Sequence, residues 1–389
     1  MPVSPGWEGV EEAFAANVAG GEEVGAGCAV YHRGRLVVDL VGGHVDAARS
    51  EPYTDDTLQL VFSTTKGVTA IAVGMCVQRG LIDYDEKVST YWPEFAAHGK
   101  GEATVAQLLS HQLGLFSVDR ELTLAEALDW KTITSVLADT APAWPIGTAH
   151  GYHALTYGWL AGELIRRTDG RSPGQFVAEE IAGPLGLDLW IGLPEEQESR
   201  VSPMIGGLAT KADDPAVQAM IDQFFGPGSN AHRALYLNGA FTFLDGSDNP
   251  FNTRQVHAVE IPAANGITNA RSLAALYAAT LGPVDGIQLL DAEVRDRART
   301  QVTPDGEVDS CLMGPTTFGM GFMVHGPFTP YSGPGSYGHP GAGGSVAFAQ
   351  PERELGFAYV MNQMATNLAG DLRAQRLTDA AAAAADAAG

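Results

Sequence analysis

A serine and a lysine three residues apart are the first pair in this sequence whose types and spacing could do chemistry. Ser63 and Lys66 stand at the head of a segment with helical apolar spacing. Residues i and i+3 share a helix face, so the amine can reach the hydroxyl. A serine hydroxyl needs a base to become a nucleophile, and lysine is a base once its pKa is lowered. The same spacing also suits a serine N-cap beside a solvated lysine, so the pair alone leaves both interpretations open.

Two later segments favour the catalytic interpretation. Tyr152 lies in a polar loop before a second helical stretch, and residues 338–345 form a glycine-rich turn before a late strand. Lys66 must be at least partly neutral to act as the base. The alternative is that Lys66 stays charged and lowers the pKa of a neighbouring phenol.

The order of Ser-x-x-Lys, loop tyrosine and late glycine-rich turn resembles the serine β-lactamase and penicillin-binding-protein superfamily. Within it, the chain is most similar to class C β-lactamase-like proteins and family VIII carboxylesterases. The resemblance extends over residues 81–95, the Leu-Leu-Ser-His-x-x-Gly-Leu element at 108–115 and the Pro-Leu-Gly-Leu element at 184–187. It implies Ser63 as nucleophile, Lys66 and Tyr152 as its catalytic partners, and the N–H groups of Ser63 and Ala342 as the oxyanion hole.

The fold that this resemblance implies is α+β and β-lactamase/transpeptidase-like, with an antiparallel sheet from both chain termini flanked by helices. Residues 1–66 and 256–389 would form the sheet domain. Residues 67–255 would form a mostly helical domain with loops that cover a cleft. Hydropathy patterns agree, because they predict strands near both ends of the chain and helices between them.

In detail, the patterns predict a hairpin over 26–42 and a helix that starts at Ser63 and stops near Gly80. Further helices are expected over 159–167, 272–281 and 372–388, and strands over 256–261, 345–349 and 356–362. Residues 222–255, rich in Gly, Asn, Pro and aromatics, are expected to form a long loop over the cleft.

Departures from the superfamily pattern bear on the substrate. Penicillin-recognising members carry Lys-[Ser/Thr]-Gly on the late strand, where this chain has His339-Pro340-Gly341. Proline has no side-chain donor, and an unperturbed histidine is mostly neutral at pH 7. After Tyr152, the chain also has Ala154 where the family's amide-binding asparagine stands. We therefore expect His339 and Gly341 to contact a neutral substrate.

The expected function is that of a carboxylesterase acting on short-chain neutral esters through an acyl-enzyme on Ser63. One alternative keeps the same catalytic residues but is an amidase, a β-lactamase or a DD-peptidase-like hydrolase. A second alternative is a non-catalytic binding protein on the same fold. We expect no metal and no cofactor, and a small-molecule ester as the partner.

A rival motif and several histidines also require interpretation. Ser172 lies in a Gly-x-Ser-x-Gly segment, but a helix is expected before it where an α/β-hydrolase elbow needs a strand. It is therefore interpreted as a helix N-cap with Pro173 at the first position. His111 is expected to be structural, whereas His150 and His153 could either line the cleft or hold the loop of Tyr152.

Composition sets the remaining bounds. The 389 residues are 45% hydrophobic with a formal net charge of -23, which predicts a large core and repulsion of nucleic acids and anionic membranes. The three cysteines have no metal-ligand spacing. No secretory signal or apolar run of about 18 residues is evident, so a cytoplasmic protein is expected. The oligomeric state is left open.

Overall fold

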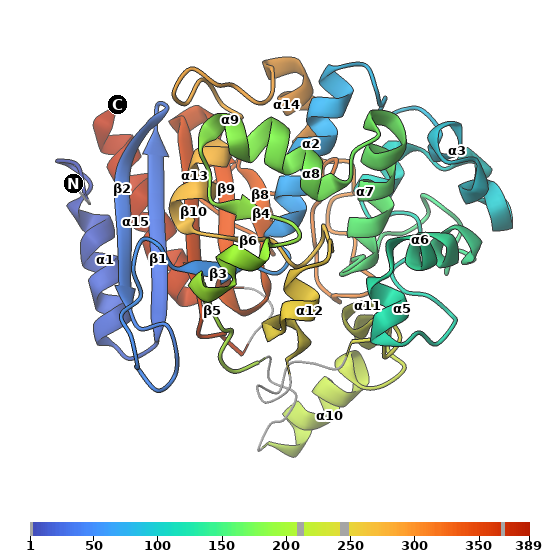
Figure 1. Ribbon diagram of the computed structural model, residues 1–389, viewed down its shortest axis with the longest axis horizontal. Helices are drawn as coiled ribbons and strands as arrows, with labels where there is room; N and C mark the ends of the chain where they lie inside the picture. The colour runs from blue at the N-terminus through green and yellow to red at the C-terminus, as the bar shows by residue number, and fades with distance from the viewer. Residues whose placement is uncertain (1–2, 208–213, 242–248, 367–369) are drawn as a thin grey trace.

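The computed structural model describes residues 3–207, 214–241, 249–366 and 370–389. Its centre is a six-stranded antiparallel sheet in the order β2-β1-β10-β9-β8-β7, built from both ends of the chain (Figure 1). Its strands are β1 (Gly25–His32), β2 (Arg35–Gly43), β7 (Met323–Val324), β8 (Tyr337–Pro340), β9 (Val346–Gln350) and β10 (Leu355–Met361). The α+β fold expected from the sequence is thereby confirmed, as are the N-terminal hairpin and the two late strands.

Helices cover both faces of this sheet. Gly27 and Gly356 face α13 (Ala270–Ala278), and a Cβ on Gly356 would lie 2.7 Å from the backbone of that helix. On the other face, Gly42 lies against Phe14 of α1 (Glu8–Ala19), which packs beside α15 (Leu372–Ala388). Small residues on the α13 face thus allow close packing, and β1 and β10 are buried along almost their whole length.

A second, smaller sheet leads into the nucleophile segment. Its order is β4-β6-β3-β5, formed by β3 (Leu58–Leu60), β4 (Leu189–Trp190), β5 (Val201–Ser202) and β6 (Ile267–Thr268). Beyond β3, the N–H of Val61 donates to the carbonyl of Gly266 at 3.0 Å. This pairing fixes the chain two residues before Ser63.

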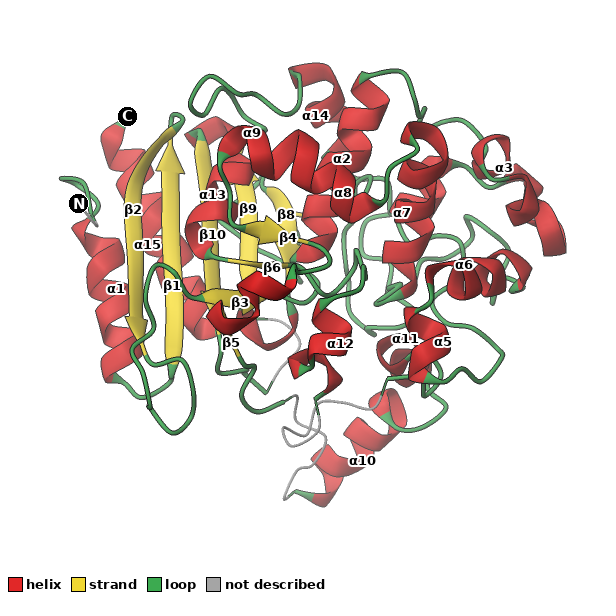
Figure 2. Cartoon of the chain, in the orientation of Figure 1, coloured by secondary structure: helices red, strands yellow, loops and turns green. Residues whose placement is uncertain are grey.

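The middle of the chain is mostly helical, and these helices gather on one side of the sheet (Figure 2). The long helix α2 (Thr65–Gln78) is buried from Thr65 to Cys76 and packs against α7 (Thr156–Asp169). The remaining helices are α3 (Val88–Tyr91), α4 (Val105–Leu109), α5 (Leu124–Leu128), α6 (Trp130–Asp139), α8 (Pro173–Val177), α9 (Gly183–Leu185), α10 (Pro215–Phe225), α11 (Asn230–Tyr236), α12 (Arg254–His257) and α14 (Ala292–Ala298).

Two expectations about local structure are wrong. The strand expected over 256–261 is replaced by α12 and an irregular segment, because the Thr253 side chain caps the N–H of Val256 and starts a helical turn. The loop expected over 222–255 contains the end of α10, all of α11 and a 3₁₀ turn at Pro250–Asn252. Ser229 and Asn249 cap these short helices, which are too brief to show a periodic pattern. Residues 242–248 of this segment lie outside the described residues.

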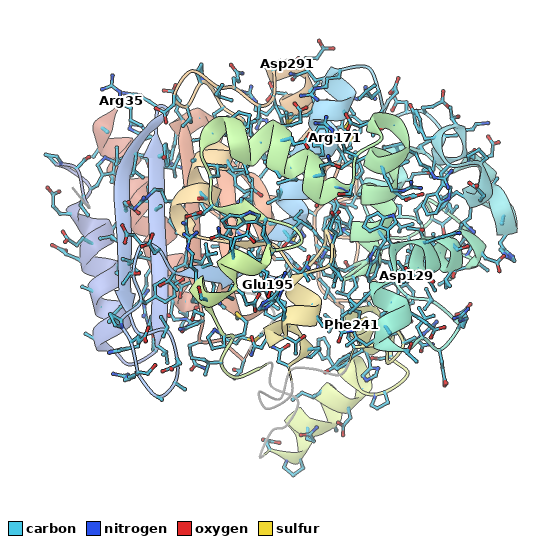
Figure 3. All side chains as sticks on the ribbon, viewed as in Figure 1. Arg35, Asp129, Arg171, Glu195, Phe241 and Asp291 are labelled. Carbon is cyan, nitrogen blue, oxygen red and sulfur yellow. The ribbon has the colours of Figure 1, made fainter. Side chains whose placement is uncertain are left out.

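The Gly-x-Ser-x-Gly segment is a helix start, as interpreted from the sequence. Ser172 follows α7, and its hydroxyl oxygen accepts the N–H of Gln175 in α8 while the hydroxyl donates to Glu260 at 2.6 Å. The neighbouring Arg171, labelled in Figure 3, forms ion pairs with Asp169 and with the acidic side chains that follow α8. Within the described residues, no helix is both long and apolar enough to cross a membrane.

The cap at Ser172 generates a stability prediction. Ser172→Ala should lower the free energy of unfolding by about 1 kcal/mol, because it removes the cap of α8, and should leave the reactivity of Ser63 unchanged. Urea unfolding and labelling of Ser63 by an organophosphonate measure the two effects. Loss of labelling in this variant would restore the elbow interpretation of Ser172.

Candidate active site

The turn before α2 presents Ser63 at the surface of an otherwise buried segment. Phe62 has a φ of +43°, a left-handed conformation that is uncommon for a bulky residue and turns the chain sharply from β3 towards α2. Ser63 is partly exposed, whereas Thr64, Thr65 and Lys66 after it are buried. The nucleophile candidate is thus accessible and rigidly held.

Lys66 is completely buried and has three polar neighbours. Its Nζ lies 3.1 Å from Ser63 Oγ, 2.7 Å from the carbonyl oxygen of Ala154 and 3.0 Å from that of Ala263. Burial lowers its pKa well below the usual value of 10.5, and no acidic group in the described part of the chain offsets this. A neutral amine can donate its two hydrogens to the carbonyls, which leaves its lone pair for the Ser63 hydroxyl. This arrangement suits a base.

Tyr152 lies against the same two residues. Its phenol is hydrogen-bonded to Ser63, and its ring centroid is 4.7 Å from Lys66 Nζ. Burial raises the pKa of the phenol above 10, and the hydrogen bond to Ser63 only partly offsets this. The structure therefore favours a protonated phenol over the phenolate that was one of the two alternatives.

The glycine-rich turn before β9 is hydrogen-bonded to the turn that carries Ser63. Ser345 Oγ donates to the carbonyl of Val61 at 2.9 Å and lies 3.1 Å from Thr64 Oγ1. A Cβ on Gly341 would lie 2.3 Å from the Val61 oxygen, so only glycine fits there. Among the described residues, the N–H groups of Ser63 and Ala342 have no backbone acceptor. Two free donors beside the Ser63 hydroxyl could hold an oxyanion.

Comparison with known proteins agrees with this geometry. Residues 10–382 match the family model described as "Beta-lactamase". The chain belongs to the beta-lactamase family.

Three relatives illustrate the family's range. "Esterase/beta-lactamase LipL" of Mycobacterium tuberculosis is 36% identical, over 92% of this chain and 82% of the relative. A penicillin-binding protein homolog from Caulobacter crescentus is 39% identical with a TM-score of 0.88, over 99% of both chains. A family VIII carboxylesterase structure is 37% identical with a TM-score of 0.87, again over 99% of both chains. The chain thus belongs to a family of esterase/β-lactamase-like serine hydrolases.

In this beta-lactamase family member, the residue at the late-strand lysine position is a neutral histidine. The His339 ring stacks on Tyr152 with 5.8 Å between centroids, and its Nδ1 donates to the Pro340 carbonyl at 2.7 Å. Burial, with the nearby Lys66, lowers the pKa of His339 to about 3. Its Nε2 is buried with no partner in the described residues. This position therefore supplies no positive charge at neutral pH.

A buried charge cluster behind the glycine-rich turn was not identified from the sequence. Gly343 carries a carbonyl that accepts Arg373 Nη2 at 3.1 Å and the N–H of Ala365 at 2.8 Å. Arg373, from α15, also pairs with the buried carboxylate of Glu23 and the partly exposed carboxylate of Asp371. Burial raises the pKa of Glu23 to about 7, although Arg373 opposes the shift. No local sequence motif identifies these residues, because they are far apart in the sequence and come together only in the folded structure.

The histidines near Tyr152 belong to the scaffold of its loop. His153 Nδ1 donates to the Gly151 carbonyl at 2.6 Å, and its Nε2 accepts the N–H of Leu115 at 3.0 Å. His111 Nδ1 accepts the N–H of His153 at 3.1 Å. Burial lowers the pKa of His153 to about 3 and that of His111 well below 6.5. These three hydrogen bonds hold the loop of Tyr152 in place. The contact of His150 with Thr316 Oγ1, at 2.9 Å, holds it as well.

The lowered pKa of Lys66 predicts the pH dependence of Ser63 reactivity. The protonated amine has no lone pair, so reactivity should be lost as the pH falls through the Lys66 pKa and should reach a plateau well below pH 10.5. The rate of Ser63 phosphonylation as a function of pH measures this. A rise centred near or above pH 10 would assign the base to the Tyr152 phenolate, and a maximum in acid would contradict both assignments.

Proposed function

We propose that the protein is a carboxylesterase that hydrolyses short-chain uncharged esters through an acyl-enzyme on Ser63. The observation that carries the proposal is the Lys66 Nζ at 3.1 Å from Ser63 Oγ, combined with a neutral His339 at the position of an anion-binding lysine. The substrate would lie between the sheet region, residues 1–66 and 256–389, and the helical region, residues 67–255.

The proposed acylation starts with proton transfer. The neutral Lys66 amine accepts the proton of the Ser63 hydroxyl as Oγ attacks the ester carbonyl carbon. The oxyanion accepts hydrogen bonds from the N–H groups of Ser63 and Ala342. As the tetrahedral intermediate collapses, the Tyr152 phenol gives its proton to the leaving alkoxide and regains one from the Lys66 ammonium.

Deacylation reverses these proton transfers with water in place of the alcohol. Water attacks the acyl carbon, and its proton passes through Tyr152 and Lys66 back to Ser63 Oγ. The carboxylic acid leaves, and the side chains return to their starting protonation states. Every step uses only side chains, backbone N–H groups and water.

Charge supports a neutral substrate. His339 is uncharged, Pro340 has no hydroxyl, and Ala154 uses its carbonyl to hold Lys66 and has no side-chain amide. The chain's formal net charge of -23 further disfavours the approach of an anion. A neutral ester needs none of the missing contacts.

β-Lactam hydrolysis is the second candidate, because the mycobacterial relative's name includes both activities and the acylation machinery is the same. β-Lactam hydrolysis differs from the proposed ester hydrolysis in the charge of the substrate. A non-catalytic binding protein would differ from both candidates because its Ser63 would be unreactive.

The assignment of the nucleophile predicts the effect of removing one oxygen. Ser63→Ala should lower kcat for a nitrophenyl ester by about 10³-fold or more. The free energy of unfolding should change by no more than about 1 kcal/mol, because the side chain is small and partly exposed. Mass spectrometry should find a phosphonate adduct on Ser63 in the wild type only. Substantial turnover by Ser63→Ala would contradict the mechanism, and an unlabelled wild type would favour a binding protein.

The substrate charge predicts a preference. Neutral short-chain esters should have a kcat/KM at least about tenfold above that of penicillins, because one charge-assisted anchor is missing. Steady-state kinetics on a nitrophenyl ester and a penicillin compare them, with Ser63→Ala as the blank for both. Equal or better penicillin hydrolysis would favour the second candidate.

A further inference from the structure

A buried carboxylate holds the main chain of Tyr152. Asp309, fully buried in the segment between α14 and β7, accepts the N–H of Tyr152 on Oδ1 at 3.0 Å. The same oxygen accepts the N–H groups of Cys311 and Leu312, both at 2.8 Å. Thr316 Oγ1 donates to the other oxygen at 2.9 Å. Four donors therefore converge on one carboxylate.

This carboxylate has no lysine or arginine partner among the described residues, and the nearest cationic candidate is His150, with Nε2 4.0 Å from Oδ2. A buried carboxylate without a cation is unfavourable unless hydrogen bonds replace its hydration. Three of the four donors are local or lie on the same segment, and the fourth is the N–H of Tyr152, 157 residues away. The long-range bond is the one that links the segment to the active site.

The loop of Tyr152 is held from both sides. On one side, Asp309 holds the N–H of Tyr152, and the N–H of Ser310 donates to the His150 carbonyl at 2.9 Å. On the other side, His111 accepts the N–H of Gly151 on its carbonyl, and the N–H of His153 on Nδ1, both at 3.1 Å. The direction of the Tyr152 side chain is thereby fixed by the backbone on either side of it.

We propose that Asp309 is a positioning residue that holds the Tyr152 phenol against Ser63 and keeps it able to protonate the leaving alcohol. The inference rests on the proposed esterase function, and it concerns one step of that function, the departure of the alcohol.

The charges around Tyr152 support the second part of the inference. Its ring faces Lys66 at 4.7 Å, His111 at 5.2 Å and His339 at 5.8 Å, and it interacts electrostatically with the buried phenols of Tyr157 and Tyr331. The histidines are neutral because burial lowers the pKa of each. The negative charge of Asp309 adds to burial in raising the pKa of Tyr152. Removing this charge should therefore let the phenol lose its proton at a lower pH.

The test compares two esters with the same acyl group. A nitrophenolate leaves without a proton, whereas a simple alkoxide needs one, so only the alkyl ester depends on a general acid. Asp309→Asn keeps an oxygen for the N–H of Tyr152 but removes the charge. We expect its kcat/KM to fall about 10²-fold for the alkyl ester and at most about tenfold for the nitrophenyl ester. The alkaline limb of the alkyl-ester profile should also move to lower pH.

Asp305→Asn is the matched control, because Asp305 is exposed on the same segment and its side chain hydrogen-bonds only to Gln301 among the described residues. It should behave as wild type on both esters. If wild type and control hydrolyse both esters but Asp309→Asn loses activity equally on both, with an unmoved alkaline limb, the inference is overturned while the esterase function stands. Wild type inactive on both esters would overturn the function itself.

A second variant covers the case in which Asp309→Asn does not fold. Thr316→Val removes one donor from the carboxylate, together with the contact of Thr316 Oγ1 with His150 Nε2, and leaves the bond of Asp309 to Tyr152 in place. It should show a smaller loss with the same selectivity for the alkyl ester. Equal effects on the two esters would again overturn the inference.

Discussion

The burial of the Lys66 amine, with no counter-ion among the described residues, is the constraint on which the rest of the site depends. A lysine in water would be charged and useless as a base at neutral pH, so the protein must remove it from water without supplying a carboxylate. Two backbone carbonyls, of Ala154 and Ala263, accept hydrogen bonds from the amine and replace its hydration. They orient the amine so that its lone pair faces the Ser63 hydroxyl. These carbonyls come from the loop before α7 and the segment before β6, so the site requires both regions in place.

The same constraint accounts for the electrostatic character of the neighbourhood. Positive charge near Lys66 would reinforce the lowering of its pKa, and negative charge in direct contact would reverse it. The groups packed around it are neutral histidines and protonated phenols, and the buried carboxylate of Asp309 bonds to the backbone N–H of Tyr152. A base and an acid can then operate side by side, each in the protonation state that burial gives it.

Much of the site was evident in the sequence because it depends on local patterns. The Ser-x-x-Lys spacing, the glycine-rich turn and the N-terminal hairpin are all short-range features, and the structure brings Ser63, Lys66 and Tyr152 into contact. Residues that act through distant partners left no such signal. Asp309 and Arg373 are ordinary charged residues until the fold places them behind the loop of Tyr152 and the turn of Gly343. The short helix α12 was missed because one capping threonine decided its structure against β-branched neighbours.

The hydrogen bond from Arg373 to the Gly343 carbonyl has a consequence for the order in which parts of the site form during synthesis. Ser63 and Lys66 are synthesised about 300 residues before Arg373 of α15, whose side chain holds the turn that carries the second free N–H. Domains fold as units during synthesis, and contacts between distant residues form late. A nascent chain would therefore contain Ser63 and Lys66 long before Arg373 could hold the Gly343 turn, and the free N–H groups of Ser63 and Ala342 would be brought together only after these distant segments had met.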